Sequence, residues 1–415
     1  MGGRDVRRTV AERQPYAGKI GALLALLMAE VLAMSVWFSS SAAIADIKRS
    51  HAVAPGVEAL LTSAVQIGFV IGTILSALLS LADRHDPRRL FALSAATAAI
   101  ATGCLVFLDP TGPAVILLRM LTGVCMAGVY PVGIRLVATW ARGDVGLLIG
   151  LLVGALTLGS ASPHLLAAFG GMDWRSIYAA ASGFAALAAV LVCFVRIGPN
   201  MTRARRIDLG KLRQGWTSPA IRKANLGYLG HMWELYAMWA WLGLFLQQSF
   251  AARGLEGGNV KAALLTFFAI GAGALGSWLG GVLADRFGRT TVTIGAMAIS
   301  GSAAAIAGWL FAAPLILLIM VTLVWGLTVV ADSAQFSAAV TELAAPDAIG
   351  TLLTIQTCAG YLLTLLSIQL VPLVQGHLGW PGAFTMLAIG PLLGCIAMWR
   401  LRSDPEARRI AGGKM

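Results

Sequence analysis

The chain has 415 residues, of which 58% are hydrophobic and only 12% are charged, and its mean hydropathy is +0.79. Soluble domains carry about 25% charged residues, so this composition excludes an ordinary soluble protein. The net charge is +12, but the basic residues lie between long apolar segments, which argues against a nucleic-acid-binding surface.

Twelve apolar segments of about 20 residues follow one another along the chain, and each is long enough to cross a hydrocarbon core of about 30 Å. A helix satisfies its own backbone in lipid, so we predict an all-α membrane protein with twelve transmembrane helices in two pseudo-symmetric six-helix halves. The predicted spans are at about 19–41, 59–82, 90–108, 113–137, 145–168, 174–196, 223–249, 261–284, 290–311, 314–337, 349–372 and 381–401. The halves are residues 1–197 and 223–415, and a basic, proline-containing linker joins them at 198–222.

The distribution of charge predicts the orientation. With these spans, 24 of the 31 Lys and Arg residues fall on one side, five on the other and two within a span. The positive-inside rule then places both termini in the cytoplasm, with the chain in the inner membrane of the cell. The first apolar run, from Ile20 to about Ser41, is longer than the core of a signal peptide, so we interpret it as an uncleaved helix.

The two halves share a repeated sequence. The octets that begin at Glu30 and Glu234, E-V-L-A-M-S-V-W and E-L-Y-A-M-W-A-W, are identical at four positions. The tripeptide Ala82–Arg84 recurs in the second half as Ala284–Arg286, at nearly the same offset. Landmarks that keep one offset and one order indicate two copies of a domain.

Both glutamates lie about 12 residues from the cytoplasmic end of their spans, roughly 17 Å deep and near the midplane. Ionisable groups at that depth cost about 2.5 to 3.5 kcal/mol on insertion scales and usually mark a pathway or a proton relay. We therefore expect Glu30 and Glu234 to face one another across a water-accessible cavity and to exchange protons or contact substrate. His231, on the face of Glu234, could share that role. The alternative is a structural hydrogen bond that holds helices together.

A charged loop follows the eighth predicted span and reads G-V-L-A-D-R-F-G-R from Gly281 to Arg289. It resembles the G-x-x-x-D-R-x-G-R cytoplasmic loop of the major facilitator superfamily, and the copy in the first half lacks both glycines. The resemblance covers nearly the whole chain and implies a transporter whose first and seventh helices line a central cavity. The gate residues that it implies are Asp83, Arg84, Gly281, Asp285, Arg286, Gly288 and Arg289.

The loop residues carry individual expectations. Gly281 should permit a close approach of helices, and Gly288 an unusual backbone angle. Asp285 should favour the positive end of the next helix. The arginines should pair with neighbouring helices and hold the inner gate shut.

Two further patterns resemble elements of this superfamily. Arg119 and Gly123 match the R-x-x-x-G element of proton-coupled members, in which the arginine is linked to proton transfer. Arg119 lies about six residues from the outer end, roughly 9 Å deep, so snorkelling to the surface is the alternative. Gly150 and Gly159 resemble the start of the antiporter signature of efflux members, although Pro163 stands where its glycine is expected.

Polar and aromatic residues within the spans are candidates for the cavity wall, since aromatic faces can hold planar or cationic ligands. The candidates are Trp37, Gln66, Tyr236, Trp241, Gln356 and Tyr361.

These features predict a proton-coupled secondary transporter of a small organic molecule, working by alternating access, with Glu30, Glu234, His231 and Arg119 as the coupling and substrate residues. Two carboxylates against one deep arginine favour export of a cationic, zwitterionic or amphipathic compound. Uptake of a small anion, such as a carboxylate or a nitrate-like ion held by Arg119, stays open, as does a non-transporting membrane sensor or partner protein.

The sequence lacks the common motifs of nucleotide-binding proteins, hydrolases and metalloenzymes. It has no G-x-x-x-x-G-K-[ST] loop, no H-E-x-x-H or G-x-S-x-G motif and no Cys/His cluster. We therefore expect no enzyme activity, cofactor or metal. The expected partners are a small-molecule substrate, protons and the lipid bilayer, with no nucleic acid, and we expect a monomer.

Overall fold

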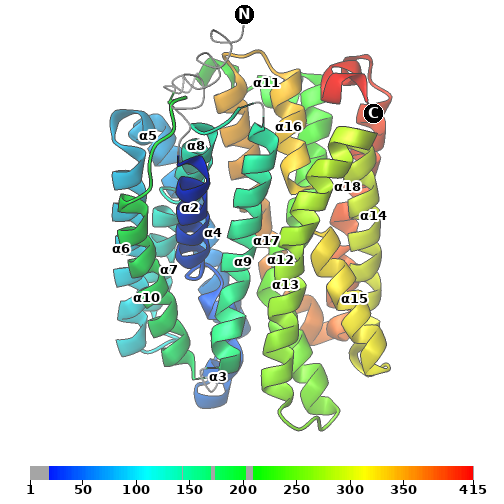
Figure 1. The fold of residues 1–415 in the computed structure, drawn as a ribbon. Coiled ribbons are helices and arrows are strands. Elements are labelled where there is room, and N and C mark those ends of the chain that lie inside the picture. The colour runs from blue at the N-terminus through cyan, green and yellow to red at the C-terminus, as the bar shows by residue number, and fades with distance from the viewer. Residues whose placement is uncertain (1–17, 143, 170–172, 202–208, 415) are drawn as a thin grey trace, which may run out of the picture.

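The computed structural model describes residues 18–142, 144–169, 173–201 and 209–414, and these residues form helices and no strands. The helices run side by side along one axis of the molecule (Figure 1). The helices of the first half are α2 (Lys19–Met34), α3 (Ser39–Ser50), α4 (Pro55–Leu78), α5 (Leu81–Arg84), α6 (Pro87–Cys104), η2 (Leu105–Phe107), α7 (Pro113–Met126), α8 (Tyr130–Ala138), α9 (Val145–Phe169) and α10 (Trp174–Cys193). Those of the linker and second half are η3 (Leu209–Lys211), α11 (Gln214–Thr217), α12 (Pro219–Ala252), α13 (Gly258–Phe287), α14 (Arg289–Ala307), η4 (Gly308–Phe311), α15 (Leu315–Thr328), α16 (Ser333–Leu343), α17 (Ile349–Leu387), α18 (Ile389–Arg402) and η5 (Pro405–Gly413).

The helices agree with the predicted all-α membrane protein. Ten segments of the described residues are long and apolar enough to cross a membrane, and one of them, Ile349–Arg402, is 54 residues long. Gly379 interrupts it with a φ of 67°, so this segment supplies two crossings. Helix α12 spans 34 residues but is not among the ten segments, and adding it makes the arrangement consistent with twelve crossings.

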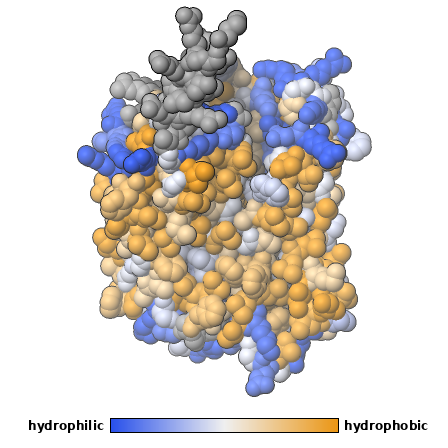
Figure 2. Space-filling view, viewed as in Figure 1, coloured by the Kyte–Doolittle hydropathy of each residue, from blue (hydrophilic) through white to orange (hydrophobic). Residues whose placement is uncertain are grey.

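An apolar band surrounds the bundle, and hydrophilic residues gather at both of its ends (Figure 2). At one end, Lys19 pairs with Asp144 at 2.7 Å and Lys223 with Asp404 at 2.5 Å. We call this the basic end, and α2 and α12 both begin there.

Three spans are broken near their middle. The helix is interrupted at residues 35–38 between α2 and α3, at 127–129 between α7 and α8, and at 329–332 between α15 and α16. Helix α12, the counterpart of the first span, continues without interruption. The matched octets at Glu30 and Glu234 therefore differ in backbone conformation, because only the first octet runs into a break.

Small residues allow the helices to approach closely. A Cβ added to Gly68 would lie 1.9 Å from the carbonyl oxygen of Met120, and one added to Gly123 would lie 2.0 Å from that of Val65. Only glycine fits at such reciprocal contacts between membrane helices, here α4 and α7. The two halves meet where α4 packs against α17, α9 against α13 and α3 against α12.

Candidate functional site

Glu30 is a fully buried carboxyl group without a hydrogen-bond partner among the described residues. Its exposed fraction is 0%, and neither carboxylate oxygen accepts or donates a hydrogen bond. It lies one turn before the break that ends α2, and its carboxylate reaches α8, where a Cβ on Gly133 would be only 2.8 Å from Oε2. The missing side chain at Gly133 thus makes room for the carboxylate, beside Leu152 of α9 and within electrostatic range of Tyr130.

Glu234 has a different environment, although it is equally buried. Its Oε1 accepts a hydrogen bond from Nε1 of Trp325 at 2.7 Å, and its Oε2 bonds to the hydroxyl of Ser300 at 2.8 Å. Both partners belong to the second half, on α15 and α14. The expectation that the two carboxylates face one another across a cavity is therefore wrong, because Glu234 points into its own half and away from the first.

His231 lies one turn before Glu234 on α12 and contacts a second acidic residue. Its Nδ1 is 2.9 Å from Oδ1 of Asp332, which lies in the break between α15 and α16, and both side chains are almost fully buried. The sequence singled out His231 as an assistant to Glu234, whereas the structure pairs it with Asp332. The pairing could not be read from the sequence, because the two residues lie about 100 positions apart on different helices.

Arg119 is fully buried and donates to backbone carbonyl groups at the break in the first span. Its guanidinium donates to the carbonyl oxygens of Val36 at 2.7 Å and Trp37 at 2.5 Å, and its Nε donates to that of Leu61 at 3.0 Å. It also donates to the hydroxyl of Ser39 at 3.0 Å. The alternative that Arg119 snorkels to the surface is wrong, because its exposed fraction is 0%. The arginine instead stabilises carbonyl groups that a broken helix presents.

Six aromatic rings join the two halves at the level of that break. Phe38 lies 5.9 Å from Tyr236 and 5.6 Å from Trp239, and Tyr236 lies 5.0 Å from Tyr361, measured between ring centroids. The hydroxyls of Tyr236 and Tyr361 are 2.5 Å apart. We call the six rings the aromatic cluster, and its members are Trp37, Phe38, Phe69, Tyr236, Trp239 and Tyr361.

The predicted cavity residues divide between this cluster and other places. Trp37, Tyr236 and Tyr361 belong to the cluster, and Phe38, Phe69 and Trp239 are additional members that the site prediction omitted. Gln66 is buried without a hydrogen-bond partner among the described residues, three positions before Phe69 on α4. Trp241 lies elsewhere and donates to the carbonyl oxygen of Ile368.

Gln356 belongs to a polar network in the second half. Its Nε2 donates to Oδ1 of Asn225 at 3.1 Å, and its Oε1 accepts from Ser337 at 3.0 Å. Asn225 in turn donates to the carbonyl oxygen of Gly215 on the short helix α11. The network attaches the linker to the second half. Both the nitrogen and the oxygen of the Gln356 amide have protein partners in it, so the amide needs no ligand to satisfy its hydrogen bonds.

Comparison with known proteins agrees with this architecture. A family model described as Major Facilitator Superfamily matches residues 26–258, more than half of the chain. The chain belongs to the Major Facilitator Superfamily. A search of curated protein sequences found no match.

Several solved transporters of low sequence identity share the fold of this superfamily member. A D-xylose–proton symporter superposes with a TM-score of 0.72 at 16% identity, covering 95% of this chain and 98% of that one. A mutant of the nucleoside transporter NupG has a TM-score of 0.71 at 16% identity, with 92% and 99% covered. A bacterial homologue of the human lysosomal transporter Spinster, inward-facing and occupied, has a TM-score of 0.71 at 15% identity, with 97% and 99% covered. At these identities the likeness shows the fold alone.

The superfamily loop after α13 is held at the basic end by one of its arginines. Arg289 donates to both carboxylate oxygens of Glu342 on α16, at 3.0 and 2.7 Å, and to the side-chain oxygen of Gln335 at 2.8 Å. Gly288 has the expected unusual backbone angle, with a φ of 93°. The arginine thus pairs with a neighbouring helix as predicted, although the partner belongs to the same half.

The other loop residues are less constrained. The expectation for Gly281 is wrong, because a Cβ added there would meet nothing within 4 Å. Asp285 and Arg286 are exposed, and the backbone carbonyl of Asp285 accepts a hydrogen bond from Lys414 at 2.8 Å. In the first-half copy Arg84 is exposed, and the side chain of Asp83 lies outside the described residues.

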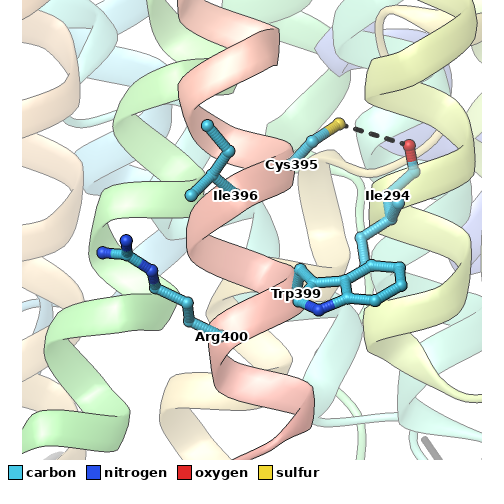
Figure 3. A pocket seen from close by; sticks show the side chains of 5 residues that line it. All are labelled: Ile294, Cys395, Ile396, Trp399 and Arg400. Carbon is cyan, nitrogen blue, oxygen red and sulfur yellow. Dashed lines mark hydrogen bonds between the residues drawn. The ribbon is translucent and has the colours of Figure 1, made fainter.

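A shallow groove of about 250 Å³ lies between α14 and α18 (Figure 3). Its lining is Ile294, Cys395, Ile396, Trp399 and Arg400. The thiol of Cys395 points to the carbonyl oxygen of Ile294 at 3.5 Å. Trp399 is largely exposed, so the groove belongs to the outer surface of the bundle and contains no predicted site residue.

Proposed function

We propose that this chain is a proton-coupled secondary transporter of a small organic molecule, working by alternating access as a monomer in the inner membrane with both termini in the cytoplasm. The observation that carries the proton coupling is Glu30, a buried carboxyl group with no hydrogen-bond partner among the described residues. Buried polar groups normally find partners, and an exception needs a functional explanation. A carboxyl group that binds a proton in one conformation and loses it in another provides that explanation.

Glu234 has a structural role in this proposal. If its carboxyl is protonated at Oε2, the proton is donated to the hydroxyl of Ser300, and that hydroxyl in turn reaches the carbonyl oxygen of Met297 at 3.4 Å. Trp325 meanwhile donates to Oε1. Every polar atom of this neutral arrangement has a partner, so Glu234 has no need to change its protonation state. The twin carboxylates would thus have separate roles, with Glu30 as the coupling group.

The aromatic cluster supports an amphipathic substrate that carries an aromatic or cationic part. Its six rings lie between the two halves, where alternating access has to open a path, and none of them carries a formal charge. Aromatic faces attract planar groups and cations. We propose export as the direction, in exchange for protons, on the partial antiporter pattern at Gly150 and Gly159 in α9.

The alternative of anion uptake has less support. It needs Arg119 as an anchor for the anion, but all three guanidinium nitrogens already donate to the backbone and to Ser39 around the break. An anion at this site would have to displace contacts that hold the first span in its broken form.

The test starts from a thermal-shift screen of the purified protein, because a bound ligand stabilises the state that it binds. A compound found in this way is then applied to liposomes that contain the protein and an internal pH dye. We expect the compound to drive proton movement through the wild type and through Glu234→Gln, whereas Glu30→Gln binds the compound and moves no protons. Undiminished proton movement in Glu30→Gln would exclude the coupling role.

A further inference from the structure

The pair of His231 and Asp332 has no role in the transport proposal above, although its geometry is specific. The two side chains meet at 2.9 Å, with exposed fractions of 1% and 2%, between α12 and the break in the tenth span. The second imidazole nitrogen, Nε2, is buried and has no hydrogen-bond partner among the described residues. This nitrogen is therefore open to a proton, which would turn a pair with one negative charge into a neutral ion pair.

Asp332 occupies a helix N-cap position, where an aspartate side chain usually forms a capping hydrogen bond. It is the N-cap residue of α16, and an aspartate there normally accepts a hydrogen bond from the first backbone amides of the helix. Here the side chain makes no capping bond, and its Oδ1 lies 2.9 Å from Nδ1 of His231 instead. This close approach is not aligned as a hydrogen bond, so Oδ1 has no hydrogen-bond partner among the described residues. Asp332 thus has two competing sets of donors, the imidazole of His231 and the N-terminus of α16.

The first half shows that the break itself does not require this pair. Its corresponding span breaks at residues 127–129, and Val129 is the N-cap residue of α8 just as Asp332 is that of α16. The residue that corresponds to His231, at the offset of the two glutamates, is Leu27. Both counterparts are apolar, so a broken helix of this kind forms without an ion pair, and the pair in the second half has to be explained separately.

Few other titratable groups face the pair. Glu234 lies one turn away on α12 and interacts electrostatically with Asp332, as does Cys395 from α18. Tyr228, also on α12, has its ring 6.2 Å from that of His231, and the remaining ring contact is Phe336 of α16. Within the described ranges, Glu234 and Asp332 have no ion pair with a lysine or arginine. His231 is thus the one basic group that ion-pairs here, and its charge decides how strongly Asp332 is held.

We propose that His231 and Asp332 form a second proton-binding site, distinct from Glu30, that controls the joint between α15 and α16. A hydronium ion from the solvent gives a proton to Nε2 of His231, so that one O–H bond breaks, one N–H bond forms and water is released. The charged imidazole then holds Asp332 away from α16. Loss of that proton weakens the hold, and Asp332 turns to cap α16, which stabilises the first turn of that helix. The inference deepens the proposed function by adding a proton-controlled movement of the second half.

The experiment uses the full-length chain in lipid bilayers, labelled with ¹⁵N-histidine, and His231→Gln assigns the signal among the five histidines. The ¹⁵N signals of the His231 imidazole report its protonation state across a series of samples from about pH 5 to pH 8. Over the same range, hydrogen exchange of amides 333–336, corrected for its intrinsic pH dependence, should slow by about fivefold, the factor that corresponds to one N-cap. Asp332→Asn should abolish the pH-dependent change in exchange.

The matched control is the double variant His231→Leu with Asp332→Val, which copies the first half. It should fold and show exchange of amides 333–336 that no longer depends on pH beyond the intrinsic trend. A His231 that keeps one protonation state across this range would overturn the proposal, as would a wild-type exchange profile that survives in Asp332→Asn. Glu30→Gln should leave the His231 titration unchanged, so this inference and the proposed function can fail separately.

Discussion

Replacing each of the twin glutamates by methionine should change stability in opposite directions. Methionine keeps the length of glutamate but offers no strong hydrogen-bonding group. Glu30→Met removes a buried carboxyl without partners, and this relieves a desolvation cost of about 1 to 3 kcal/mol. Glu234→Met leaves the buried indole N–H of Trp325 without its acceptor, which costs about 1 to 3 kcal/mol. The two variants should therefore differ by about 2 to 6 kcal/mol in stability.

The assay is thermal unfolding in detergent with a thiol-reactive dye, since Cys125 is buried and Cys358 and Cys395 are partly buried in the folded protein. We expect the midpoint to rise for Glu30→Met and to fall for Glu234→Met relative to the wild type. The matched controls are Glu30→Gln and Glu234→Gln, and in the second of these the amide can still accept from Trp325 and bond to Ser300. Equal shifts of the two methionine variants in the same direction would refute the assignment of different environments.

Three further changes have expected outcomes. Arg119→Gln should lower stability by about 2 to 6 kcal/mol, because the carbonyl groups of Val36 and Trp37 at the break lose their guanidinium donors, and the same unfolding assay measures this. Arg289→Gln should release the loop from Glu342, so hydrogen exchange at the start of α14 should rise. Lys223 donates a hydrogen bond to Asp404 and lowers the pKa of that carboxyl group. The contact therefore stabilises the C-terminal segment at pH values above the ordinary pKa of aspartate, and this stabilisation is lost as the pH falls below about 4. After correction for its intrinsic pH dependence, hydrogen exchange of η5 should therefore increase on acidification in the wild type and should change less in Asp404→Asn.

The sequence predicted the all-α membrane fold well, since hydropathy reports directly on which segments can cross a membrane. It also predicted that Glu30 and Glu234 lie deep within their helices, but it placed them beside a water-accessible cavity, whereas both are almost fully buried. The direction of each carboxylate could not be predicted, because the partners of Glu234 lie 66 and 91 residues away on other helices. Helical periodicity shows which residues share a face, but it does not show which neighbour that face meets.

The broken first span was also missed, although the sequence contains a signal for it. Residues 35–41 include four serines, Ser35, Ser39, Ser40 and Ser41, within an apolar stretch, and serine side chains compete with helical backbone hydrogen bonds. Ser35 and Ser39 bond to backbone carbonyls of Leu32 and Val36 in the structure. A deep arginine together with a serine-rich segment indicates a break that needs donors, and this combination assigns Arg119 to backbone stabilisation.

The central claim is that Glu30, and not Glu234, is the carboxyl that exchanges a proton. It is tested most directly by infrared titration of the full-length protein in lipid, following the band of protonated carboxyl groups between about pH 5 and pH 9. We predict a pH-dependent change in this band that disappears in Glu30→Gln and is unchanged in Glu234→Gln. A change that persists in Glu30→Gln and disappears in Glu234→Gln would contradict the account.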